Sequence, residues 1–118
     1  MERLSVERMR VDSDRLQRDL ATMARFTVPG LPWTRRPFTP EYAATRSWLR
    51  EEMARCGLQS RLAPAGNLIG VFPGTEPSLP PILIGSHTDT VEGGGRFDGI
   101  LGVLAGLEVV RQLRASGR

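Results

Sequence analysis

The sequence contains no lysine and has one cysteine, one histidine and one tyrosine in 118 residues. Its 16 basic residues are therefore all arginines, and they stand against 13 acidic residues. A single cysteine excludes an internal disulfide framework and fits a reducing compartment, so we expect Cys56 to be a small buried side chain. The arginines are spread through acidic segments such as residues 46–55. This distribution argues against a nucleic-acid partner.

Long apolar runs are also absent. Residues 1–8 are charged and hold no apolar run of signal-peptide length. Nothing downstream approaches the roughly 20 apolar residues of a membrane span. We therefore expect a cytoplasmic protein with no membrane partner. The length suffices for one domain, but it is short for an enzyme that needs a metal centre and a closing substrate pocket.

Two amphipathic helices are predicted in the first half of the chain. Apolar residues at helical intervals follow the short polar side chains of residues 12–14 and predict a helix to about Arg25. Prolines and a glycine in residues 29–37 predict a loop. Residues 39–41 combine a capping hydroxyl, a proline and an acid, which predicts a second helix ending near Cys56.

A β-hairpin and a central strand are predicted next. Residues 58–62 and 68–72 are short runs rich in apolar residues, and residues 64–67 between them suit a turn. Residues 81–85 are apolar on both faces, as expected of a strand that helices cover. A strand of this kind needs neighbours on both sides, and the hairpin supplies at most two.

A last helix is predicted after Asp98 and Gly99. Glycines at 102 and 106 permit close approach to the sheet. The residues expected to face inward are Ile100, Leu101, Val103, Leu104, Leu107, Val110 and Leu113. The order of helices, hairpin, central strand and helix indicates an α/β fold with an incomplete sheet.

Three side chains with metal-binding chemistry follow the predicted strand. His87 is the only histidine, and Asp89 follows at the alternate spacing that puts both side chains on one side of an extended backbone. A carboxylate that accepts from one imidazole nitrogen makes the other a better metal ligand. Beyond the triple glycine, Asp98 can return to the same point and bridge two metals. The spacing alone leaves open a histidine with a purely structural role.

A phosphate-binding loop is the second alternative for this segment, because a glycine-rich loop before a helix presents amide groups to an anion. It fits less well. No Gly-Lys-Ser/Thr sequence follows, and the acidic residues Asp89, Glu92 and Asp98 would repel phosphate unless a metal intervened.

Longer motifs surround these residues. GSHTDT at residues 85–90, GGRFDG at 94–99 and GVLAGLE at 102–108 resemble the first metal motif of the N-carbamoyl-L-amino-acid hydrolase and allantoate amidohydrolase family. That family belongs to a larger group of di-metal aminoacylases and carboxypeptidases. The resemblance extends to earlier segments, at residues 34–35, 38–41 and 66–70.

The resemblance implies roles for individual residues. His87 corresponds to the family's first metal-ligating histidine, Asp98 to its metal-bridging aspartate and Asp89 to the catalytic-site aspartate that orients the histidine. Two divalent ions are implied, with zinc, manganese and cobalt as candidates. The family often has an aspartate at the position of Ala63 and usually a serine at that of Thr90.

The resemblance also implies that residues 1–118 are the N-terminal portion of a catalytic domain. The family uses a glutamate pair, two later histidines and a separate dimerisation domain, none of which this sequence can supply. We therefore expect hydrolysis of carbamoyl or ureido C–N bonds by a homodimeric full-length enzyme, and no activity from these residues alone. The rivals are an aminopeptidase or N-acyl amino acid deacylase, and a small non-catalytic binding module.

Overall fold

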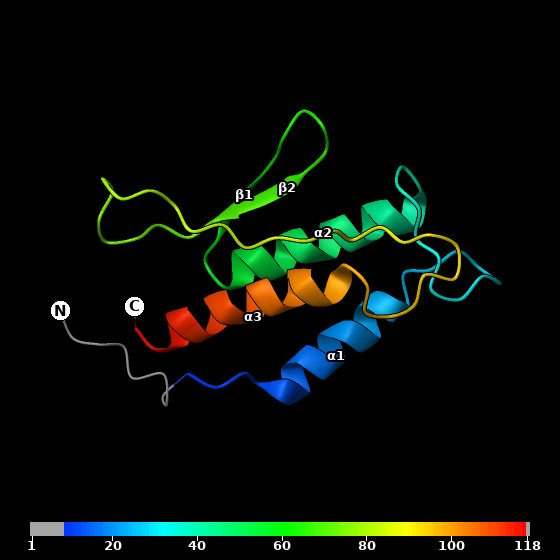
Figure 1. The fold of residues 1–118 in the computed structure, drawn as a ribbon, viewed down its shortest axis with the longest axis horizontal. Coiled ribbons are helices and arrows are strands. Elements are labelled where there is room, and N and C mark those ends of the chain that lie inside the picture. Colours follow the sequence, from blue (N-terminus) through cyan, green and yellow to red (C-terminus); the bar gives the residue numbers. More distant parts are fainter. Residues whose placement is uncertain (1–8, 118) are drawn as a thin grey trace.

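The computed structural model describes residues 9–117, so the expectation for residues 1–8 lies outside the described range. Within this range the elements are α1 (Ser13–Ala24), α2 (Pro40–Arg55), β1 (Gln59–Leu62), β2 (Leu68–Val71) and α3 (Ile100–Ala115). Figure 1 shows α3 between α1 and α2, with the hairpin on the far side of α2. The predicted helices, the hairpin and the α/β class are confirmed.

Side-chain caps explain where the first two helices begin. The Asp12 carboxylate accepts a hydrogen bond from the Arg15 amide at 2.9 Å, and the Thr39 hydroxyl accepts one from the Tyr42 amide at 3.3 Å. Each bond satisfies a first-turn amide that has no partner within its helix. Pro40 follows the second cap, where an absent amide proton has no consequence.

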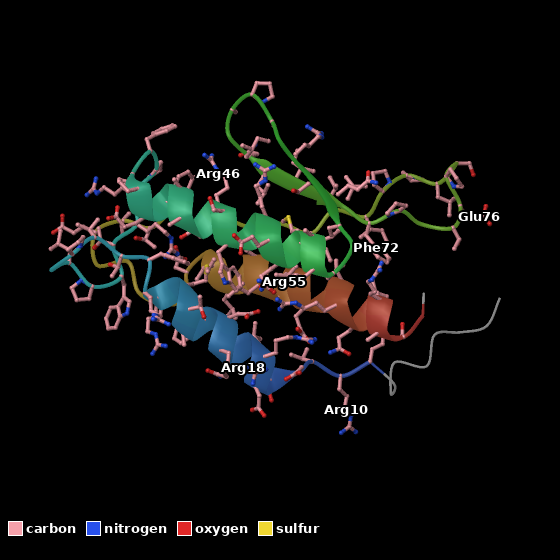
Figure 2. All side chains as sticks on the ribbon, turned by 180° about the vertical axis from the view of Figure 1, so that it is seen from behind. Arg10, Arg18, Arg46, Arg55, Phe72 and Glu76 are labelled. Atoms are coloured by element: carbon pink, nitrogen blue, oxygen red, sulfur yellow. The ribbon has the colours of Figure 1, made fainter. Side chains whose placement is uncertain are left out.

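The hairpin packs on α2. Its antiparallel register runs from Gln59 opposite Val71 to Leu62 opposite Leu68, and the turn between the strands includes Gly66 at φ +91°. Positive φ favours glycine because a Cβ would crowd the backbone there. Figure 2 shows Arg46 on the α2 surface below this turn.

The helices share one buried apolar cluster. Its members come from all three helices and the start of the hairpin, and they are Leu20, Met23, Leu49, Cys56, Leu58, Ile100, Leu104 and Leu107. Burying a side chain of this size contributes about 1.5–3 kcal/mol. The expectation that Cys56 is buried is confirmed. The expectation for Leu101 is wrong: it is 40 % exposed, because the helix face turned toward the core is narrower than its apolar stripe.

The predicted central strand is not formed. Residues 81–85 form no regular structure, and Ile82, Leu83 and Ile84 are exposed. Between residues 9 and 117 the only sheet is the hairpin itself, so this segment has no strand beside it to supply the ladder of hydrogen bonds. It nevertheless lies close to α3. A Cβ at Gly106 would lie 2.9 Å from Cγ2 of Ile84, so the helix glycine does permit a close approach, to an extended segment rather than to a sheet.

Glu108 joins α3 to the start of α1. Its carboxylate accepts two hydrogen bonds from the Arg15 guanidinium, both at 2.8 Å, one from Gln112 and one from the Asp12 amide. Burial alone raises the pKa of Glu108, but these hydrogen bonds outweigh it and lower the pKa from 4.5 to about 2.

Arg111 makes a second buried connection, between α3 and both other helices. Its guanidinium donates to Asp19 of α1 at 2.5 Å and to Glu52 of α2 at 2.7 Å. The side chain is only 9 % exposed, so the pair of carboxylates compensates a charge that would otherwise be buried alone.

No helix in the described part of the chain is long and apolar enough to cross a membrane.

Candidate metal centre

His87 lies in the loop that leads into α3, against the glycine that precedes the helix. Gly99 has φ +74°, and a Cβ built on it would lie 2.4 Å from both Cε1 and Nδ1 of the His87 ring. The absence of a side chain at this position therefore lets the imidazole pack against the backbone at the start of α3. The loop glycines Gly93 and Gly95 also have positive φ, at +61° and +89°.

The hydrogen bonding of His87 defines which ring nitrogen is free. Nδ1 lies 3.0 Å from the backbone carbonyl oxygen of Asp89. A carbonyl only accepts, so Nδ1 carries the proton in this bond, and in the neutral imidazole Nε2 then keeps its lone pair. The Asp89 carboxylate lies 3.4 Å from the same nitrogen. The structure thus brings Asp89 to His87 as the sequence predicts, with its carbonyl nearer than its carboxylate.

Asp98 approaches the opposite side of the ring. Its Oδ2 lies 3.6 Å from His87 Nε2, the nitrogen with the free lone pair. Two ligands that each lie about 2.0–2.2 Å from one zinc ion are separated by at most about 4.4 Å. A neutral imidazole and a carboxylate at this separation are a donor set that suits a divalent transition metal. The two residues therefore fit as ligands of one ion.

The donors are open to solvent, and their number is small. The side chain of His87 is 50 % exposed and that of Asp98 is 76 % exposed. Across residues 9–117 no group of three histidine, cysteine, aspartate or glutamate side chains is arranged to hold a metal ion. The described residues thus bring two candidate ligands together without completing a coordination sphere.

Residues 33–35, in the loop between α1 and α2, support the candidate centre through hydrogen bonds. No role in the site was predicted for these residues from the sequence. The Thr90 amide donates to the Arg35 carbonyl at 2.8 Å, and the Arg35 amide donates to the Thr90 hydroxyl at 2.8 Å. Further along, the Gly94 amide donates to the Trp33 carbonyl and the Gly93 amide to the Thr34 hydroxyl. These bonds fix residues 90–94 against residues 33–35.

Three residues that make these hydrogen bonds are polar and yet buried. Thr34, Arg35 and Thr90 are 2 %, 4 % and 7 % exposed. No local pattern reveals that such residues meet, and only the resemblance at residues 34–35 pointed to them. Thr90 stands where the family usually has serine, but its hydrogen bonds here use only the hydroxyl and the backbone, which serine also has.

Known proteins resemble the chain in both sequence and fold. It is 39 % identical over 108 residues to an N-carbamoyl-L-amino-acid amidohydrolase of Paenarthrobacter aurescens, covering 92 % of the chain and 26 % of the relative. It is 43 % identical over 72 residues to an allantoate amidohydrolase of Escherichia coli, covering 61 % of the chain and 18 % of the relative.

A solved hydantoinase/carbamoylase family amidase from Burkholderia ambifaria superposes with a TM-score of 0.86 at 40 % identity, covering 92 % of the chain and 27 % of the amidase. No family model matches the chain. The chain spans only about a quarter of these amidases in length. By sequence and fold the chain is similar to N-carbamoyl-L-amino-acid and allantoate amidohydrolases over about a quarter of their length.

Proposed function

We propose that this chain is the N-terminal metal-binding portion of an amidohydrolase that cleaves the C–N bond of N-carbamoyl amino acids, allantoate or similar ureido compounds. The observation that carries the proposal is the pairing of His87 Nε2 with Asp98 Oδ2 at 3.6 Å, in a chain whose relatives bear the names of such hydrolases. The proposal includes a homodimeric full-length protein in the cytoplasm. The buried, unpaired Cys56 is compatible with that compartment.

His87 and Asp98 are the proposed ligands, and Asp89 is the proposed orienting residue. Two divalent ions, with zinc, manganese and cobalt as candidates, would supply Lewis acidity toward the substrate carbonyl and lower the pKa of a water toward neutrality. The hydrogen bond at Nδ1 supports His87 as a ligand because it fixes the tautomer whose Nε2 lone pair is free. The Asp98 carboxylate can bridge two ions because it has two oxygens, one of which already faces the imidazole.

Metal depletion and substrate comparison test this function in the full-length protein. We expect a chelator to abolish turnover of N-carbamoyl amino acids or allantoate and zinc, manganese or cobalt to restore it, since the proposed ions polarise the scissile carbonyl. The measurement is product release before and after metal addition. Turnover that survives complete metal removal contradicts the proposal. A clear preference for N-acetyl or peptide substrates would favour a deacylase or aminopeptidase instead.

The Asp89→Asn substitution tests whether the Asp89 carboxylate is needed to orient His87 or whether the Asp89 backbone carbonyl is sufficient. We expect the folded state to persist and metal loading or turnover of the full-length protein to fall roughly 10- to 100-fold, since losing an orienting partner has this scale. Metal content by elemental analysis and the rate per loaded site measure the change. Asp14→Asn, at an exposed position in the first turn of α1, is the matched control and should leave both unchanged. Wild-type loading and rate in Asp89→Asn would show that the carbonyl alone orients the ring.

A further inference from the structure

Arg35 is a buried cation bound mainly to backbone carbonyls. Its side chain donates to three of them: Nε to Thr88 at 2.7 Å, and Nη1 to Met23 and Phe26 at 3.0 Å each. The residue is 4 % exposed, and it forms no ion pair within 4 Å with any described carboxylate. Burial lowers the pKa of this guanidinium, and the nearby charge of Asp89 opposes that effect. Burying a charged group costs free energy unless hydrogen bonds or an opposite charge compensate it.

Two of the carbonyls anchor the guanidinium to a rigid element. Met23 lies in the last turn of α1, and Phe26 follows just after it. The Met23 carbonyl also accepts from the Phe26 amide at 3.1 Å, and carbonyls at a helix C-terminus carry the negative end of its dipole, so a cation there is favoured. Arg35 therefore takes its own position from the end of α1.

The third carbonyl belongs to the metal loop. Thr88 lies between His87 and Asp89, so the oxygen that Arg35 Nε holds is part of the peptide group joining Thr88 to Asp89. The rotation of that peptide decides where the Asp89 backbone lies, and the Asp89 carbonyl is the acceptor that fixes the His87 ring. The hydrogen bonds of the Arg35 backbone with the Thr90 amide and hydroxyl hold the far side of Asp89. A guanidinium has several N–H donors fixed in one plane, so a single arginine can bind carbonyl groups of two segments at once.

We propose that Arg35 is a positioning residue of the candidate metal centre, which holds the Thr88 carbonyl against the end of α1 and thereby sets the tautomer and direction of His87. The inference rests on the proposed function for its metal but not for its geometry. The Arg35 guanidinium forms no hydrogen bond or ion pair with either candidate ligand, so it acts through the Thr88 carbonyl.

The test uses Arg35→Met in the 118-residue chain, with two independent measurements. His87 is the only histidine, so the nitrogen NMR signals of one imidazole report its tautomer without ambiguity. At pH 8, where an imidazole is ordinarily neutral, we expect the wild type to carry its proton on Nδ1 and the variant to show a mixture of tautomers. By titration with Zn²⁺ we expect binding to weaken roughly 10- to 100-fold.

Arg35→Lys keeps the charge but loses the planar array of donors, and we expect it to recover only part of both properties. Arg15→Met is the matched control for lost stability, because its guanidinium binds Glu108 rather than the metal loop. It should leave the tautomer and the zinc affinity unchanged under conditions where the chain is folded. If Arg35→Met does not fold, Arg35→Lys decides between the outcomes.

A wild-type tautomer and wild-type zinc affinity in the folded Arg35 variants would overturn the inference while leaving the proposed function intact. Failure of the proposed function would give a different result. If wild-type chain and full-length protein bind no zinc, the metal proposal fails, and the tautomer measurement still decides whether Arg35 positions His87.

Discussion

Replacing Glu108 by glutamine is expected to lower the free energy of unfolding by about 3 kcal/mol. The Glu108 side chain is 1 % exposed, Oε1 accepts from Asp12, Arg15 and Gln112, and Oε2 accepts from Arg15. A glutamine amide keeps one acceptor oxygen but points N–H donors at the Arg15 guanidinium, which then loses its main counter-charge, at a position where the replaced side chain is buried. The depression of the Glu108 pKa from 4.5 to about 2 corresponds to a similar energy, about 3 kcal/mol. Urea unfolding followed by circular dichroism measures it.

The pH dependence of stability provides a second signature of Glu108. Because the folded pKa lies below the unfolded value, this stabilisation is present above pH 4.5 and is lost as the pH falls toward 2. Glu108→Gln should lack this component. Glu51→Gln is the matched control, since Glu51 sits on the surface of α2 with its side chain 66 % exposed and 3.9 Å from Arg55. Its expected cost is at most about 0.5 kcal/mol. Equal losses in the two variants would contradict a special role for Glu108.

Local signals in the sequence were sufficient for the elements that depend on local chemistry. A cap forms within residues 12–14, at Asp12, and another forms at Thr39 as expected, and the helices that follow them begin where predicted. The hairpin forms because residues 64–67 satisfy the turn and both strands are close in sequence. Each of these structures is decided by side chains and backbone within a few residues.

Residues 81–85 show where such signals are insufficient. Their composition is that of a buried strand, but a strand also needs a paired neighbour, and a composition does not specify where that neighbour lies. Within the described part of the chain the hairpin strands pair only with each other, so Ile82 and Leu83 remain exposed.

In the candidate site, too, local signals predicted some residues and missed others. Alternate spacing brought His87 and Asp89 together, and the glycine loop returned Asp98 to the ring. Arg35 contacts Thr88 across 53 positions in the sequence, and no periodicity or motif chemistry predicts a guanidinium bound to carbonyls at that distance. The resemblance marked residues 34–35, but the contact that makes Arg35 a support of the site is visible only in the fold.

Gly99 is the position where one added methyl group should disturb the candidate metal centre most. In Gly99→Ala the new Cβ would lie 2.4 Å from the His87 ring and 2.5 Å from the His87 backbone oxygen. Rotating the imidazole relieves only the first clash, so the loop or the start of α3 must move as well. The φ of +74° adds strain of order 1 kcal/mol for a residue with a Cβ.

We expect Gly99→Ala to reduce turnover of the full-length protein roughly 100-fold, because displacing a catalytic group by about 1 Å has effects of that size. Zinc binding by the 118-residue chain should weaken in parallel. Gly95→Ala separates strain from collision: Gly95 also has positive φ, at +89°, but its added Cβ would meet no atom within 4 Å. The control should therefore lose some stability yet keep most of its zinc affinity. If both variants bind zinc equally well, contact between position 99 and the imidazole does not define the site, and the geometry assigned to His87 is wrong.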